Sequence, residues 1–310
     1  MVPEAWEMRV NYGIAALVFL FLILAGTTLT SFSVSGADND TTLTRVNITN
    51  TEPDLHGLML DPVSVDLSPA NTTQINCTGY VYDLNGWDDV DYANATLYDY
   101  SQGDGPTTDN NYRYRNSSCS CAEVDANNAS CSCIFDVWYY ANNGTWQCNM
   151  TAYDSYGISD TNTSNNITIN TVIGIDSQAE IDYGNLSVTE TSTDKTANVS
   201  NYGNALINVS VRAYGGDTDA TNPGNNSLTC DLGNITLPYE RYSLSSGTDF
   251  TAMTAVTNDS TYMGLQVPVR TNDTAYENDT QLTYWKLRIP LTVGGYCNGT
   301  LIFTAEEYNE

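Results

Sequence analysis

The sequence predicts an all-β protein with two β-sandwich domains in tandem after an N-terminal hydrophobic segment. Three observations support this prediction. Apolar and polar side chains alternate through most segments beyond residue 57, as they do in strands with one buried face. Eight cysteines, an even number, suit disulfide-stapled domains in an oxidising compartment. A phrase built on one cysteine, one aspartate and one glycine occurs twice, which suggests two matched strands of one sandwich.

Residues 1–37 contain the apolar run GIAALVFLFLILA and end in the small residues SFSVSGA. The run is short for a bilayer span, which needs about 20 residues, and cleavage after Ala37 fits a secretory signal peptide. The competing interpretation keeps residues 13–34 as a membrane anchor or a pilin-like helix. Under both interpretations residues 38–310 lie outside the cytoplasm, and the chain meets a membrane only if the apolar segment is not cleaved.

Residues 38–56 precede the first sandwich and contain one strand-like piece, LTRVNIT, without an obvious partner. We interpret this segment as an extended linker. Two alternatives remain open. The piece could be a first strand, or it could be a donor strand that completes the sheet of a neighbouring subunit, as in several surface filaments.

The first sandwich is expected over residues 57–171, where the phrase C-x-x-x-x-Y-D-x-x-G begins at Cys77 and again at Cys148. If the two strands run in the same direction in facing sheets, both cysteines lie at one depth and can form a disulfide. The strands TQINCTGYVYD and GTWQCNMTAYD would then be the second and sixth strands of the sandwich.

These strands, with YDLNGWDDV and GTWQCNMTAYDSYG, resemble Ig-like and PKD-like modules of prokaryotic, especially archaeal, cell-surface proteins. The resemblance covers residues 57–171 and implies an Ig-like sandwich whose second and sixth strands carry the Cys77–Cys148 bridge. It says little about a ligand. In one departure from that pattern, Trp87 and Trp146 are not expected at the usual core position of the tryptophan.

Residues 112–140 contain CSC twice, separated by AEVDANNAS, and are expected to form an antiparallel hairpin. Its register would place four pairs opposite each other: Cys119 with Cys133, Cys121 with Cys131, Tyr112 with Tyr140, and Tyr114 with Trp138. The cysteine pairs would form disulfides, and the aromatic pairs would stabilise the sheet. The alternative is a metal ion bound by the four thiolates.

Residues 172–310 are expected to form the second sandwich. The segments IDYGNLSV, MGLQVPVR, LTYWKLRIPLTV and YCNGTLIFTAEE alternate with period two, and VSNYGNALINVSVRAYG is similar to a strand pair of adhesion-type modules on prokaryotic surfaces. Pro290 falls within an expected strand, which predicts an edge or a bulge there. Cys230 and Cys297 are left to pair and to staple this domain.

The Ig-like strand order would place the loop that follows Asp83 beside the loop that follows Asp154. Both loops are rich in carboxylates, whose hard oxygens suit Ca²⁺. We therefore hypothesise a calcium site and expect no other cofactor. The alternative is a pair of solvated Asx-Gly turns. The candidate ligands are Asp83, Asp88, Asp89, Asp154 and Asp160, with Asp91 close by.

Twenty N-x-[ST] sequons occur in the chain, whereas its 34 Asn and 64 Ser and Thr would produce about seven by chance. This excess indicates a chain built to carry N-linked glycans. Many sequons have an apolar middle residue, so a strand would turn the asparagine to solvent and its apolar neighbour to the core. The expected sites are Asn39, Asn47, Asn71, Asn76, Asn94, Asn116, Asn128, Asn143, Asn149, Asn162, Asn166, Asn185, Asn198, Asn208, Asn225, Asn234, Asn258, Asn272, Asn278 and Asn298.

Charge and motif content exclude several functions. The chain has 10 Lys and Arg against 37 Asp and Glu, a net charge of −27 that repels nucleic acid. It contains no nucleophile elbow, HExxH, P-loop or dinucleotide fingerprint, so we do not expect an enzyme.

The expected function is that of an extracellular structural glycoprotein stabilised by disulfides. It would self-associate as the subunit of a surface filament, a pilus or an S-layer-like coat. The first alternative is a monomeric cell-surface adhesin that binds a glycan or a partner cell. The second alternative is a virion surface glycoprotein.

Overall fold

The computed structural model describes residues 41–216, 224–271 and 278–308, and it is almost entirely β. The hydrophobic segment at 13–34, the cleavage point after Ala37 and the sequons at Asn39 and Asn272 lie outside the described residues. Among the described residues, no helix has the length and apolar character needed to cross a bilayer. Residues 41–48 contain no strand, and each of them is exposed.

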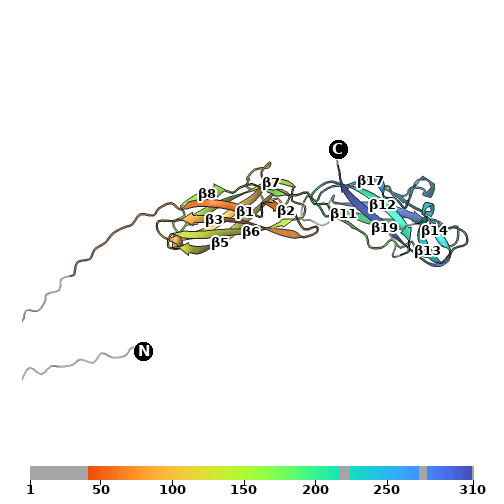
Figure 1. Ribbon diagram of the computed structural model, residues 1–310, viewed down its shortest axis with the longest axis horizontal. Coiled ribbons are helices and arrows are strands. Elements are labelled where there is room, and N and C mark those ends of the chain that lie inside the picture. Colours follow the sequence, from red (N-terminus) through yellow and green to blue (C-terminus); the bar gives the residue numbers. More distant parts are fainter. Residues whose placement is uncertain (1–40, 217–223, 272–277, 309–310) are drawn as a thin grey trace, which may run out of the picture. The chain divides into compact units, whose positions relative to one another are not determined.

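The first sandwich contains the strands up to residue 169 (Figure 1). They are β1 (Asp54–Asp61), β2 (Ser64–Val65), β3 (Thr72–Tyr82), β4 (Val90–Asp99), β5 (Arg113–Asp125), β6 (Asn128–Trp138), β7 (Gly144–Asp154), β8 (Ser159–Thr163) and β9 (Ile167–Ile169). The hydrogen-bonded order is β1-β3-β6-β5-β4-β7-β9-β2, with β8 on β7. Since β1 begins at Asp54, the last residues of the expected linker belong to this sheet.

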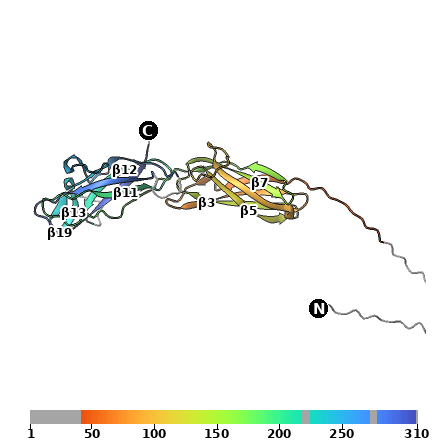
Figure 2. The ribbon, with the colours of Figure 1, turned by 180° about the vertical axis from the view of Figure 1, so that it is seen from behind.

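The core of this sandwich follows the expected alternation of faces. In β3, Ile75, Cys77, Gly79 and Val81 are buried, while Asn76, Thr78 and Tyr80 between them reach solvent to differing degrees. Strands β3 and β7 are labelled in Figure 2, and the disulfide Cys77–Cys148 joins them across the core. Trp146 on β7 is also fully buried, and its indole Nε1 donates to the Asn142 carbonyl at 2.8 Å.

Strand β5 changes partner along its length, so the predicted hairpin register is only partly correct. Its C-terminal part pairs with β6, where Cys121 faces Cys131, but its N-terminal part pairs with β4, where Tyr114 faces Leu97. Trp138 pairs with β3 instead. The predicted Tyr112–Tyr140 and Tyr114–Trp138 pairs are therefore wrong. A strand that passes from one sheet to the other keeps its backbone groups hydrogen-bonded by exchanging partners.

The second sandwich contains two five-stranded sheets, ordered β10-β11-β18-β15-β16 and β14-β13-β19-β12-β17. Its strands are β10 (Ile175–Ser177), β11 (Lys195–Asn201), β12 (Ile207–Gly215), β13 (Asn226–Leu232), β14 (Asn234–Thr236), β15 (Glu240–Ser243), β16 (Thr254–Ala255), β17 (Thr261–Val267), β18 (Thr280–Leu287) and β19 (Gly294–Glu307). Val199, Val209 and Trp285 are fully buried in the cluster between the sheets.

Two details of this sandwich differ from the prediction. Residues 181–188 form no strand, and in this segment the Tyr183 hydroxyl donates to Glu240 Oε1 at 2.8 Å. Strand β18 ends at Leu287, three residues before Pro290, so the proline lies beyond the strand rather than in an edge or bulge of it. Proline has no backbone N–H to donate to a ladder, which accounts for this position.

Four disulfides join the eight cysteines in the pairs that the sequence indicates. They are Cys77–Cys148, Cys119–Cys133, Cys121–Cys131 and Cys230–Cys297. No cysteine is free, so the alternative of a four-thiolate metal site does not hold in this structure.

Candidate metal centre

Asp83 follows β3 directly and begins the first of two matching turns. Its backbone carbonyl accepts a hydrogen bond from the Gly86 N–H at 3.2 Å, and its Oδ1 accepts one from the Asn85 N–H at 2.7 Å. Gly86 has a φ of 124°, which side chains with a Cβ rarely allow. The short 3-10 helix η1 (Trp87–Asp89) follows at once and presents Asp89 to the same end of the sandwich.

Asp154 ends β7 and begins the second turn. Its carbonyl accepts from the Gly157 N–H at 3.0 Å, and its Oδ1 accepts from the N–H groups of Tyr156 at 2.9 Å and Ile158 at 2.8 Å. Aspartate commonly hydrogen-bonds the backbone two residues further on in this way. The repeated Y-D-x-x-G phrase therefore forms the same Asp-led turn twice.

The sheet topology brings the two turns together. Each strand from β3 through β6, β5 and β4 to β7 is antiparallel to the next, so β3 and β7 run in the same direction. The Cys77–Cys148 disulfide holds them at one depth, six residues before Asp83 and Asp154. Both aspartates therefore leave their strands at the same end of the core.

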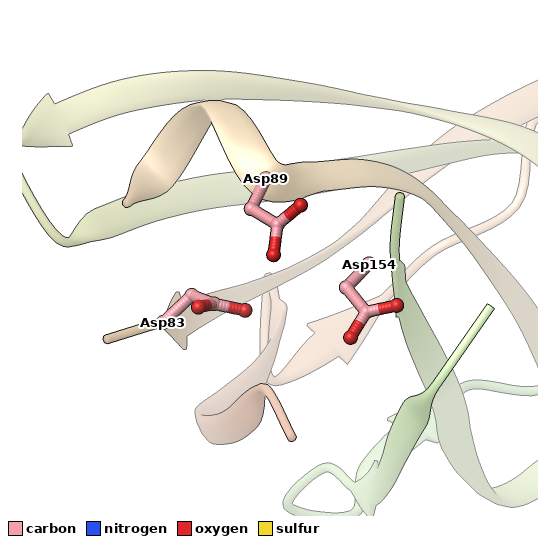
Figure 3. Close-up of side chains that lie close together, drawn as sticks. All are labelled: Asp83, Asp89 and Asp154. Atoms are coloured by element: carbon pink, nitrogen blue, oxygen red, sulfur yellow. The ribbon is translucent and has the colours of Figure 1, made fainter. Parts of the chain in front are cut away.

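Asp83, Asp89 and Asp154 form a compact cluster of carboxylates at this end. Each offers an oxygen, and the three oxygens all lie within 4.8 Å of one another. Figure 3 shows the three side chains turned toward one common space from three separate segments of the chain. Asp83 and Asp154 are fully buried, and Asp89 is half-buried.

One oxygen of Asp83 and one of Asp89 are held by hydrogen bonds, while the second oxygen of each has none. Asp89 Oδ1 accepts from the Ser155 hydroxyl. Asp83 Oδ2 and Asp89 Oδ2 are buried without a hydrogen-bond partner among the described residues. Buried polar atoms in native proteins almost always have a partner, so these two oxygens are exceptional.

The electrostatics of the cluster are unfavourable as the side chains stand. Burial raises the pKa of Asp83, and the charges on Asp89 and Asp154 raise it further, against a hydrogen bond from Asn85 that lowers it. Two like charges 4.8 Å apart repel by about 3 kcal/mol at an effective dielectric constant of about 20. A cation in the shared space would convert this repulsion into attraction.

Two of the five predicted calcium ligands, Asp88 and Asp160, are not part of this carboxylate cluster. Asp160 does not join the cluster, because its Oδ2 accepts from the Leu55 N–H at 2.8 Å and its Oδ1 from the Thr161 N–H at 2.8 Å, which ties β1 to β8. Asp88 is exposed and lines a shallow hollow with Asn85, Asp89 and Tyr156.

Asn50 is a member of this site that sequence reasoning missed. Its Nδ2 donates to Asp154 Oδ2 at 2.5 Å, and its own Oδ1 is buried without a hydrogen-bond partner among the described residues. The next residue, Thr51, donates its N–H to Asn85 Oδ1 at 2.8 Å. No local pattern predicts these contacts, because Asn50 lies 104 residues from Asp154 in the chain.

The expected glycosylation sites lie on accessible positions. Among the described residues, eighteen of the twenty sequon asparagines are present, and none of the eighteen is buried. The alternation within the sequons is clear in the strands. Asn234 is exposed beside the fully buried Ile235, and Asn198 is exposed beside the fully buried Val199.

No known protein family matches the chain, and no curated protein matches it in sequence. Among solved structures, it is similar to the complex of the chaperone CsuC with the tip adhesion subunit CsuE from Csu pili of Acinetobacter baumannii. That likeness has 11% identity and a TM-score of 0.36, and covers 79% of this chain and 97% of the other.

Two further likenesses are looser. The first is to carbohydrate-binding modules of the β-sandwich superfamily, with 9% identity, a TM-score of 0.25, and coverage of 84% of this chain and 98% of the other. The second is to BcpA, the major pilin subunit of Bacillus cereus, with 9% identity, a TM-score of 0.24, and coverage of 78% and 57%. Superpositions this loose define neither a family nor an activity.

Proposed function

We propose that this chain is an N-glycosylated structural subunit of an extracellular assembly, such as a surface filament, a pilus or an S-layer-like coat. The observation that carries the proposal is the surface distribution of the sequons. Seventeen described sequon asparagines are exposed or half-buried on two disulfide-stapled sandwiches and one, Asn47, is exposed before them, while the apolar residues beside many of them build the cores. Glycans at these positions would cover both domains without disturbing their packing.

The disulfides point to an oxidising, extracellular compartment, since such bonds are rare in the cytosol. Pairs such as Cys77–Cys148 also restrict the unfolded chain, by an amount that grows with the length of the closed loop. A net charge of −27 keeps free subunits apart in solution. Together these properties suit a protein exposed to proteases and to changing ionic conditions.

Self-association has a candidate contact in the segment before the first sandwich. Leu43, Val46 and Ile48 are 75%, 85% and 77% exposed in a stretch without secondary structure. Apolar side chains at this exposure are stabilised when a partner covers them. In the proposed assembly this segment adds to a sheet of a second copy of the chain.

Electron microscopy of the native cell surface, with mass spectrometry of the isolated material, tests the proposal. We expect regular polymers of this chain and hexose-bearing peptides that contain the sequons. Monomeric protein that binds a glycan column would instead favour an adhesin. Unmodified asparagines in native material would contradict the glycoprotein part of the proposal.

A further inference from the structure

We propose that Asp83, Asp89 and Asp154, together with Asn50, bind one calcium ion at the end of the first sandwich. This site is independent of the proposed structural function, because it rests on three carboxylates and one amide rather than on the glycans or on self-association. The carboxylate oxygens converge from the end of β3, from η1 and from the end of β7, and the Asn50 amide reaches Asp154 Oδ2 from the segment before β1.

The first argument is the set of buried oxygens that lack partners. Asp83 is fully buried, yet its Oδ2 has no hydrogen bond among the described residues. Asp89 Oδ2 and Asn50 Oδ1 are also buried without a hydrogen-bond partner among the described residues. A cation coordinated by these oxygens would satisfy all of them at once, whereas water could donate to only two of them.

The second argument is that the turns hold the carboxylates in position. Backbone N–H groups bind Oδ1 of Asp83 and Oδ1 of Asp154, and the Ser155 hydroxyl binds Oδ1 of Asp89. These bonds orient the carboxylates, as the outer contacts of metal ligands do in known sites. They therefore direct the three carboxylates to the common space that Figure 3 shows.

The donor chemistry selects the ion. The cluster offers only oxygen, since every cysteine is in a disulfide, and the one histidine, His56, is exposed and lies within hydrogen-bond distance of the Asp54 carbonyl. Hard oxygens suit Ca²⁺ and Mg²⁺ rather than Zn²⁺. Calcium takes six to eight ligands in flexible geometry, and the hollow beside Asp88 leaves room for water to complete the set, whereas magnesium demands a strict octahedron.

Calcium at this position would also fix the point where the chain enters the sandwich. Asn50 would bind the ion directly, and Thr51 already donates to Asn85 in the first turn. Binding would therefore tie residues 50–51 to the ends of β3 and β7, which lie far from them in sequence. The site would stiffen the junction that leads to the exposed segment 41–48.

The test is calcium binding by the full chain. Protein stripped with EDTA is titrated with CaCl₂ and with MgCl₂ by calorimetry, and its thermal unfolding is followed with and without each ion. We expect one calcium ion to bind per chain, a higher Tm with calcium, and a smaller shift with magnesium. Absence of calcium binding would overturn the proposal, and an equal shift with magnesium would overturn the choice of ion.

Matched variants locate the site. Asp83→Asn keeps the acceptor for Asn85 but removes one charged ligand, so we expect calcium affinity to fall by about tenfold or more. The control Asp91→Asn makes the same change of charge at an exposed neighbouring position and should bind calcium like the parent. Equal binding by the two variants would contradict the assignment.

Two further variants guard against misfolding. Asp89→Asn should show the same loss if Asp83→Asn does not fold. Asn50→Ala should weaken calcium binding but leave the Tm in EDTA close to that of the parent. An Asn50→Ala protein with undiminished affinity would remove Asn50 from the ligand set.

Discussion

Asp83 and Asp154 occupy the same position in two copies of one turn, and their carboxylates meet although 71 residues separate them in the chain. The disulfide Cys77–Cys148 has the same sequence separation, and each of its cysteines lies six residues before one of the two aspartates. Because β3 and β7 run in the same direction and the disulfide holds them at the same depth, the two strands end beside each other. Each copy of the repeated C-x-x-x-x-Y-D-x-x-G phrase therefore forms one of the two Asp-led turns at the carboxylate cluster.

The first prediction concerns this link between the disulfide and the site. Replacing both Cys77 and Cys148 by alanine should lower the free energy of unfolding by about 2–5 kcal/mol and weaken calcium binding, because the two turns lose their common depth. Calorimetric titration and denaturant unfolding measure both effects.

The Cys230→Ala, Cys297→Ala double variant is the matched control for this prediction. It opens a loop of similar length in the second sandwich, with a sequence separation of 67 against 71. We expect it to lose stability while its calcium affinity stays unchanged. A parallel loss of affinity in both double variants would show that the effect is not specific to the first sandwich.

A second prediction follows from the buried Glu240. Burial raises its pKa from 4.5 to about 7, against the hydrogen bond from the Tyr183 hydroxyl that lowers it. The folded state therefore binds this proton more tightly than the unfolded state does. The stabilising contribution is complete below pH 4.5 and is lost as pH rises to about 7, a change on the order of 3 kcal/mol.

Glu240→Gln tests this dependence, because the amide oxygen still accepts from Tyr183 but the side chain does not ionise. Urea unfolding at pH 5 and pH 8 should show a smaller loss of stability in this variant than in the parent. Glu180→Gln, at an exposed position, should behave like the parent. Identical pH profiles for the parent and Glu240→Gln would refute the prediction.

A third prediction separates the two faces of a sequon strand. Ile235→Ala should cost about 2–5 kcal/mol, because Ile235 is fully buried. Asn234→Gln, at the adjacent exposed position, should change stability by less than about 0.5 kcal/mol and remove one glycan from the native protein. Chemical denaturation and glycopeptide mass spectrometry check the two effects, and a large destabilisation by Asn234→Gln would contradict the assigned faces.

A fourth prediction concerns assembly. Replacing Leu43, Val46 and Ile48 by aspartate should abolish polymers seen by negative-stain microscopy while the Tm of the sandwiches stays the same, because these side chains contribute to neither core. The sequon at Asn47 survives this change.

The matched control for assembly replaces Thr42 and Thr44 by aspartate and Arg45 by glutamine, which leaves the sequons at Asn39 and Asn47 intact. It adds the same charge to the same segment without removing an apolar side chain. This control should still polymerise. If both triple variants assemble normally, the segment is not the contact.

Much of the fold follows from local pattern. Period-two alternation identified β3, β7 and most other strands, and it placed Cys77 and Ile235 inward with the neighbouring asparagines outward. The repeated phrase indicated the pair Cys77–Cys148, the hairpin register indicated Cys119–Cys133 and Cys121–Cys131, and elimination left Cys230 with Cys297. These features depend on residues close together in the chain, or on matched positions in two strands, and so a single sequence carries them.

The incorrect predictions share one cause. Because β5 changes partner along its length, Tyr114 pairs with Leu97 and not with Trp138. Asp160 accepts a hydrogen bond from the Leu55 N–H and is not part of the carboxylate cluster. Period two says which face a side chain occupies, but it does not say which strand lies beside it.

The sequence by itself determined an all-β chain whose cysteines pair in disulfides and whose sequon asparagines lie on the solvent face of the strands. It also determined that the same Asp-led turn occurs at two places. Only the tertiary structure decided that Asn50 joins Asp83, Asp89 and Asp154 and that Asp160 does not, because those contacts depend on how distant segments meet at the end of the sandwich. Local stereochemistry sets the direction of each side chain, whereas long-range packing chooses its neighbours.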